Sequence, residues 1–135
     1  LAGLTATAGP AAAAEPRCDH AGSTWTGVYG NTHVWVPMGS QSLNCYMNRG
    51  EVGEEVRAMQ TALVNCYGAG ISIDGQFGPR TQTALRAAEA SHGMTSDLGR
   101  YSSYDAWNLR FWGWYEDSNG NVRWRCSRMD GPILP

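Results

Sequence analysis

Hydrophobic residues recur at helical spacing in the middle of the chain, within the stretch Gly53–Leu85. Val56, Met59 and Leu63 fall at positions i, i+3 and i+7, so they would lie on one stripe of a helix. Gly68 follows this stripe, and a glycine just past the last periodic residue is typical of a helix end. The pattern therefore predicts an amphipathic helix with one buried face.

A second helix is predicted a few residues later. Asp74 and Gly75 form a turn signal, because glycine tolerates the positive φ of tight turns. Gly78 and Pro79 are typical of an N-cap and a first helical residue, where proline's missing N–H costs nothing. The predicted helix runs to about residue 92 and ends at Gly93. Its buried stripe is predicted to contain Ala84, Leu85 and Ala88.

A faint internal repeat predicts a third helix. When residues 75–85 are laid over residues 99–109, a glycine, the aromatic residue two positions later and the final leucine coincide. Ser102 and Asp105 match the Ser-x-x-Asp signature of a capping box, so the helix should run from about Ser103 to Leu109. Two matched turn-and-helix units around one core imply pseudo-symmetric halves.

Segments rich in β-formers predict a hairpin at each end of the chain. Residues 23–36 are rich in threonine, valine and aromatic side chains and break at residues 30–31, which favours two short strands around a turn. Residues 111–115 and 122–126 flank the Asn-Gly pair at 119–120, a strong hairpin signal. Whether the two hairpins join into one sheet stays open at this stage.

Charge and hydropathy exclude two kinds of partner. The 135 residues carry a net charge of −2 and 16% charged side chains, which offers no basic surface for nucleic acid. No apolar run approaches the roughly 20 residues that span a bilayer. Neither nucleic acid nor a membrane is therefore an expected partner.

The first fourteen residues predict export. Residues 1–14 are uncharged and rich in alanine, and they resemble the tail of a signal peptide that lacks its methionine and basic region. A helix of the folded domain is the alternative, although Gly3, Gly9 and Pro10 oppose it. If residues 1–14 are a signal peptide, the mature protein is secreted and begins at Glu15.

Four cysteines in a chain with such a leader predict two disulfides. Sequence does not choose among the three possible pairings; the pairing we favour joins Cys45 to Cys66 and Cys18 to Cys126. A zinc site is the rival interpretation, but the chain has no Cys-x-x-Cys or His-x-x-x-His spacing. No metal or other cofactor is expected.

The central stretch resembles the peptidoglycan-binding domain found on bacterial cell-wall hydrolases. The family pattern is roughly Gly-x-x-Val-x-x-Leu-Gln-x-x-Leu, a loop, Asp-Gly-x-Phe-Gly-x-x-Thr, and Gly-Leu-x-x-Asp-Gly. The matching residues are Gly53, Val56, Met59, Gln60, Leu63, Asp74, Gly75, Phe77, Gly78, Pro79, Thr81, Gly93, Met94 and Asp97. The family's usual Phe-Gln late in the second helix is Ala88-Glu89 here. The leader and the cysteines look like those of secreted actinobacterial members.

The resemblance implies a mainly α fold. The expected fold is a compact three-helix core at residues 49–110, flanked by the short β-hairpins predicted above, which lie outside the family pattern, and stabilised by disulfides. Residues 1–14 would be a signal peptide remnant, 15–48 an N-terminal extension with a hairpin, and 111–135 a C-terminal aromatic hairpin and tail.

The resemblance also implies a secreted, non-catalytic module that binds the stem peptide or glycan of peptidoglycan in a shallow groove near the two turn-helix units. Arg80 and Tyr104 are the favoured contacts, because they occupy the same exposed slot in the first turn of the two units. Most of the other candidates also have a purely structural interpretation. The full set is Gln60, Asp74, Gly75, Phe77, Gly78, Pro79, Arg80, Thr81, Tyr101, Tyr104 and Trp107.

Alternative functions stay open. The same fold could dock an extracellular protein partner, or the chain could be a small cell-wall amidase or peptidase. Catalysis has little support, since the three histidines lie in unrelated contexts and no catalytic motif is present. Trp112, Trp114 and Trp124 either close the core or form a platform on which sugar rings stack.

Overall fold

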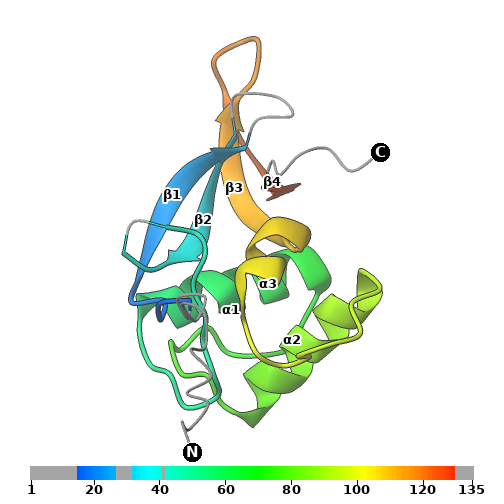
Figure 1. The fold of residues 1–135 in the computed structure, drawn as a ribbon. Helices are drawn as coiled ribbons and strands as arrows, with labels where there is room; N and C mark the ends of the chain where they lie inside the picture. Colours follow the sequence, from blue (N-terminus) through cyan, green and yellow to red (C-terminus); the bar gives the residue numbers. More distant parts are fainter. Residues whose placement is uncertain (1–14, 27–31, 41, 130–135) are drawn as a thin grey trace, which may run out of the picture.

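The computed structural model describes residues 15–26, 32–40 and 42–129. Across these residues the chain forms three helices, with a four-stranded sheet standing beside them (Figure 1). In chain order the elements are β1 (His20–Thr26), β2 (Thr32–Met38), α1 (Glu54–Tyr67), α2 (Pro79–Ser91), α3 (Ser103–Asn108), β3 (Arg110–Glu116) and β4 (Val122–Arg128).

The predicted helices are confirmed, together with the signals that delimit them. Val56, Met59 and Leu63 are buried on one side of α1, and the N–H of Gly68 donates to the carbonyl of Leu63 at its end. Pro79 begins α2.

The predicted capping box at the start of α3 is also confirmed. The Asp105 carboxylate accepts the Ser102 N–H at 2.8 Å, and the Ser102 hydroxyl accepts the Tyr104 N–H at 3.3 Å. Local sequence signals therefore place all three helices.

The prediction of a mainly α fold is wrong. Both hairpins form, but they join into one antiparallel sheet with the order β1-β2-β3-β4. The link is short, with His33 paired to Trp114 and Val34 paired to Gly113. The joined sheet contributes to the same core as the helices, through residues such as Val36 and Phe111. The chain is an α+β protein in which helices and sheet share one core.

Gly113 makes the junction of the two hairpins possible. A Cβ built at this position would collide with the backbone oxygen of His33 and crowd Val34. Glycine is therefore required where β2 and β3 approach each other. The sheet is strongly curled, because the hydroxyls of Thr26 in β1 and Ser127 in β4 lie 3.2 Å apart although these are its two edge strands.

α1 lies at the centre of the molecule, between the sheet and α2 (Figure 1). Its buried stripe contacts side chains from both neighbours. The largest fully buried side chains around it are Met47, Phe77, Leu85, Tyr101, Leu109 and Phe111. Burial of these large side chains is the main source of stability for this core.

All four cysteines form disulfides, but the pairing favoured from the sequence is wrong. The observed bonds are Cys18–Cys45 and Cys66–Cys126. Cys18 lies against Cys45 because its N–H donates to the carbonyl of Tyr46 at 2.9 Å. Cys126 reaches Cys66 because β4 runs past the end of α1.

Candidate functional site: a groove along α2

A groove of about 560 Å³ runs between the end of α1 and one side of α2. The α2 residues that line it lie at positions 80, 83, 84, 87, 88 and 91, the spacing of a single helical stripe. Apart from Arg80, every side chain on this stripe is alanine, serine or threonine, and these small side chains leave a hollow on the surface of α2. The full lining is Tyr67, Ala69, Gly70, Ile71, Pro79, Arg80, Thr83, Ala84, Ala87, Ala88 and Ser91.

Part of the groove exists because residue 88 is alanine. The family pattern has a phenylalanine at this position, and the sequence left open whether aromatic side chains of the hairpins fill the space that the missing phenylalanine leaves. In the structure Ala88 lines the groove, and no residue of the sheet does. Ala88 itself is buried, so it borders the groove from the core side.

The start of α2 gives one end of the groove a positive electrostatic character. Arg80 is exposed there and makes no ion pair with any residue that the structure describes. The first turn of α2 has no acidic side chain, and its N-cap Gly78 supplies no side-chain cap. A helix N-terminus with free N–H groups and a nearby guanidinium favours a carboxylate ligand.

A rigid aromatic wall closes the other end of the groove. The Tyr67 hydroxyl accepts the N–H of Arg110 at 2.8 Å and lies 2.6 Å from Nε2 of His92. Burial lowers the pKa of His92, with the charges of Arg128 and Arg110 adding to the effect. The ring is therefore neutral near pH 7, and its Nε2 can accept the tyrosine proton.

The structure divides the predicted contact residues into three groups. Pro79 and Arg80 line the groove, with Gly78 just before them. A buried group builds the turn or the core: Gln60, Gly75, Phe77, Thr81 and Tyr101, together with Asp74, whose carboxylate is bound within the turn. Tyr104 and Trp107 lie on α3, outside the groove: Tyr104 is 72% exposed, and the Trp107 indole N–H donates to Asn44 at 3.2 Å.

Gln60 holds the first turn together and has no polar group left for a ligand. Its side-chain oxygen accepts the N–H groups of Asp74 at 3.1 Å and Gly75 at 2.9 Å. Its side-chain nitrogen lies within 3.0 Å of acceptors on Asp74, Gln76 and Thr81. Hydrogen bonds from the Gln76 N–H and from Gln60 lower the pKa of Asp74. These residues fix the turn that sets the start of α2.

Replacing Gln60 with leucine should destabilise the domain by about 2 kcal/mol, because buried N–H groups of the turn lose their acceptor at nearly constant side-chain volume. Urea unfolding measures the change. Gln76→Leu is the matched control, since that side chain is exposed and should change stability by less than about 0.5 kcal/mol. Equal stability of the two variants would contradict the role assigned to Gln60.

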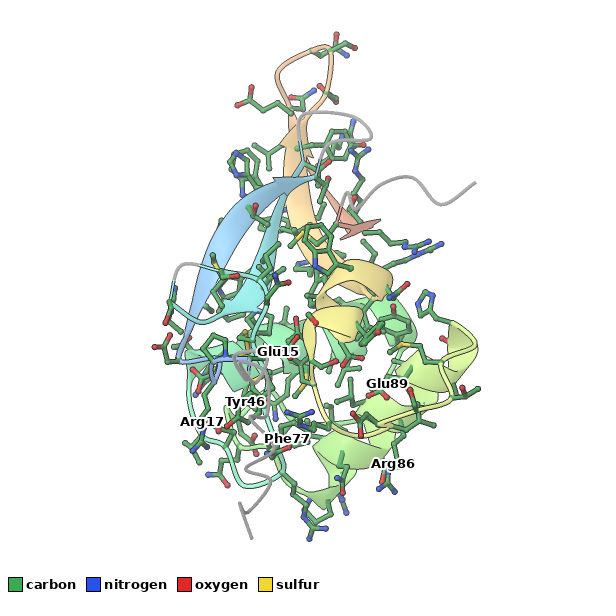
Figure 2. All side chains as sticks on the ribbon, viewed as in Figure 1. Glu15, Arg17, Tyr46, Phe77, Arg86 and Glu89 are labelled. Carbon is green, nitrogen blue, oxygen red and sulfur yellow. A yellow bond between two sulfur atoms is a disulfide. The ribbon has the colours of Figure 1, made fainter. Side chains whose placement is uncertain are left out.

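Glu89 has the same role in the turn before α3 as Gln60 has in the turn before α2, because each side chain accepts the N–H of a glycine in its turn. Both of its carboxyl oxygens accept the N–H of Gly99, at 3.1 and 3.2 Å. Gly75 and Gly99 have similar left-handed φ values of 76° and 85°, a region that favours glycine. Figure 2 shows Glu89 on α2 beside the chain that leads to α3. The internal repeat predicted from the sequence is therefore present in three dimensions.

Glu89 belongs to a buried cluster of ionisable groups with Tyr101 and Asp105, all at most 1% exposed. Burial, with the charge of Asp105 as a second cause, raises the pKa of Glu89 to about 8. Burial raises the pKa of Asp105 to about 7, against the hydrogen bond from Ser102. The Tyr101 hydroxyl and Oδ1 of Asp105 have no hydrogen-bond partner among the described residues. This cluster makes stability depend on pH.

Residues 52–102 match a family model described as "Putative peptidoglycan binding domain". The match covers less than half of the 135 residues. The matched segment contains α1, α2 and the groove between them, so the resemblance drawn from the sequence is confirmed and cell-wall binding is supported.

Two individual proteins are similar to parts of the chain. The zinc D-Ala-D-Ala carboxypeptidase of Streptomyces albus G is 36% identical over 53 residues, which cover 38% of this chain and 21% of the carboxypeptidase. The chain thus spans about a fifth of that relative's length. The crystal structure of a peptidoglycan-binding protein from Clostridioides difficile in complex with glutamine hydroxamate aligns with a TM-score of 0.47 and 21% identity, covering 62% of this chain and 52% of that one.

The described residues contain neither a metal-binding cluster nor a membrane-spanning helix. No three His, Cys, Asp or Glu side chains among them are grouped so that they could hold a metal ion. None of the helices in that part of the chain has the length and hydropathy needed to cross a membrane.

Sequence reasoning missed most of the groove along α2. It correctly assigned Ala84 and Ala88 to the packed stripe of α2, since Ala88 is buried and Ala84 packs against the core, but it did not foresee that both also line the groove. It did not single out Tyr67, Ala87 or Ser91. The signal that could have found them is the run of small side chains at i, i+3, i+4 and i+7 beside the leucine stripe.

Proposed function

We propose that this chain binds peptidoglycan without catalysis and that the groove along α2 receives the stem peptide. The observation that carries the proposal is a groove with small apolar walls that ends at an unpaired Arg80. The family match supports peptidoglycan as the ligand class, and the groove is the described cavity within the matched segment.

The dimensions of the groove suit a short peptide. Its α2 residues extend from position 80 to position 91, which at 1.5 Å per residue is roughly 16 Å. An extended chain of about five residues has a similar length. Alanine-sized side chains fit against Ala84 and Ala87, and a terminal carboxylate would lie next to Arg80 and the free N–H groups of α2.

A binding role without catalysis agrees with the location of the two carboxyl groups whose pKa values are raised, because both are buried in structural positions. Glu89 and Asp105 are the acids that burial shifts towards neutral pH, the range in which a general acid or base would act. Both are buried, and both accept backbone N–H groups of turns. Their perturbed pKa values are explained by structural burial rather than by a reaction.

We also propose that the protein acts outside the cytoplasm. Two disulfides in a chain of this size are typical of oxidising compartments. The leader-like residues 1–14, which lie outside the described part of the chain, support the same proposal. Tyr104, exposed on α3, remains a predicted contact on a separate surface.

Substituting Arg80 with alanine should weaken binding to insoluble peptidoglycan by about 5- to 30-fold. The reason is the loss of a partly exposed charge-assisted hydrogen bond, which contributes about 1–2 kcal/mol. Co-sedimentation at low salt measures the affinity, and binding should weaken as salt rises because the contact is ionic.

The matched control is Arg49→Ala, which removes the same charge from an exposed site outside the groove. Its affinity should equal that of the wild type. If the Arg80 and Arg49 variants bind equally well, the carboxylate end of the ligand does not lie at Arg80. If the wild type does not co-sediment at all, peptidoglycan binding itself is refuted.

A further inference from the structure

Three tryptophans lie together on one face of the β3–β4 hairpin. Trp112 and Trp114 alternate along β3, and Trp124 is the cross-strand partner of Trp114. The indole rings of Trp112 and Trp124 are stacked, with centroids 5.8 Å apart and planes 15° from parallel. We call these three residues the indole face.

The indole face does not close the core. The β3 side chain in the core is Phe111, which points to the opposite side of the sheet from Trp112 and Trp114. Trp124 is 58% exposed, one of the most exposed large hydrophobic side chains in the described chain. Trp112 and Trp114 beside it are half-buried, so the three rings form a partly open aromatic surface.

The rings are held in place before any ligand arrives. Trp114 is stacked on His33 of β2 at 4.6 Å, and Trp112 and Trp124 support each other. None of the three indole N–H groups donates a hydrogen bond to a described residue, whereas the N–H of Trp107 does. The indole face therefore combines fixed planar rings with free donors.

The indole face continues towards the groove. At its base Arg110 and Arg128 are exposed and directly opposite each other across the two strands. Like charges in this position repel, and neither forms an ion pair with a described acidic residue. The N–H of Arg110 donates to the Tyr67 hydroxyl, which belongs to the wall at the end of the groove. The indole face, the two arginines and the groove along α2 therefore lie next to one another in this order.

We propose that the indole face binds the glycan strand of peptidoglycan, with pyranose rings stacked on Trp124 and Trp112. The inference deepens the proposed function, because it places the sugar and peptide parts of one ligand on adjacent surfaces. Pyranose rings have apolar C–H faces that stack on indoles, and their hydroxyl and acetamido oxygens can accept the free indole N–H groups. The anionic stem peptide attached to the glycan would pass Arg110 and Arg128 on its way to the groove.

A glycan fits these features better than an apolar protein surface. The indole N–H groups of the face donate to no described residue, and they suit the hydroxyl and acetamido oxygens of a sugar. The repelling arginine pair at its base matches an anionic polymer. No residue of the indole face lines the groove, so the two surfaces can be tested independently.

The test is an NMR titration with peptide-free glycan strands, prepared from peptidoglycan by removal of its stem peptides. The indole N–H signals of Trp112, Trp114 and Trp124 should shift in the wild type. Trp124→Ala should lower glycan affinity about 10-fold, and Trp124→Phe, which keeps an aromatic ring, should stay within about 3-fold of the wild type. Val52→Ala is the control, because it removes another exposed apolar side chain outside both surfaces.

The outcomes separate the two proposals. If the glycan shifts no indole signal, or if Trp124→Ala and Trp124→Phe both bind like the wild type, the indole face does not bind the glycan, even where whole peptidoglycan still co-sediments. Binding of peptide-free glycan by a protein that ignores soluble stem peptide would uphold the indole face and refute the groove. A chitin oligomer serves as a second probe: equal binding shows that the stacked amino sugar alone is recognised, as proposed.

Discussion

Glu89→Gln should make the domain more stable than the wild type by about 3–4 kcal/mol at pH 8 and leave it nearly unchanged at pH 5. The folded structure raises the pKa of Glu89 to about 8, chiefly by burial, whereas the unfolded chain has the ordinary value of 4.5. Above pH 4.5 unfolding therefore releases a proton that the folded state keeps. Stability falls by roughly 1.4 kcal/mol per pH unit until Glu89 ionises in the folded state as well.

The Glu89→Gln variant removes this pH-dependent loss of stability without disturbing the turn. Its amide oxygen can accept the Gly99 N–H, as Gln60 accepts the equivalent N–H of Gly75. Asp105, whose pKa burial raises to about 7, is present in both proteins, so the difference between them reports Glu89 together with its coupling to Asp105.

Urea unfolding at pH 5, 6, 7 and 8 measures the effect. Glu116→Gln is the control, because that glutamate is exposed at the end of β3 and its substitution should leave the pH profile unchanged. Parallel profiles for the wild type and Glu89→Gln would show that Glu89 is ionised in the folded protein across this range and that the buried cluster does not hold its proton.

Removing the Cys66–Cys126 disulfide should destabilise the folded protein by about 4 kcal/mol. The two cysteines are 60 residues apart, so the bond greatly restricts the unfolded chain. It also ties β4, an edge strand, to the end of α1. A domain of this size has few other means of compensating for such a loss.

The double variant Cys66→Ala with Cys126→Ala tests this by chemical unfolding under oxidising conditions. Its matched control is Cys18→Ala with Cys45→Ala, where the smaller separation of 27 predicts a smaller entropic term, although both of these side chains are buried and their removal adds a packing cost. A loss below about 1 kcal/mol for the 66–126 pair would contradict the account of how the hairpin is anchored.

Local signals predicted the helices and both hairpins because the decisive interactions are local. The capping box of Ser102 and Asp105 joins residues three apart, and Gly120 supplies the positive φ of its turn. The sheet was missed because His33 and Trp114, which join the hairpins, lie 81 residues apart. Their pairing depends on the room that Gly113 leaves, which no local pattern reveals.

The site was predicted only in part, for a related reason. Pro79 and Arg80 were recognised because the family motif places them at the start of a helix. Ala84 and Ala88 were placed correctly on the packed stripe of α2, but their part in the groove was missed, because whether a small helix residue also lines a hollow depends on what lies opposite. The disulfide pairing likewise follows from strand positions that only the tertiary structure defines.

The central claim is that the stem peptide of peptidoglycan lies in the groove along α2. The most direct test is an NMR titration of the labelled protein with a soluble stem peptide free of sugar. The amide signals of Gly70, Arg80, Thr83, Ala84 and Ala87 should shift together, and Ala87→Trp, which fills the groove from an exposed position, should abolish the shifts while the fold is retained. Shifts confined to the sheet or to α3, or unchanged binding by Ala87→Trp, would contradict the claim.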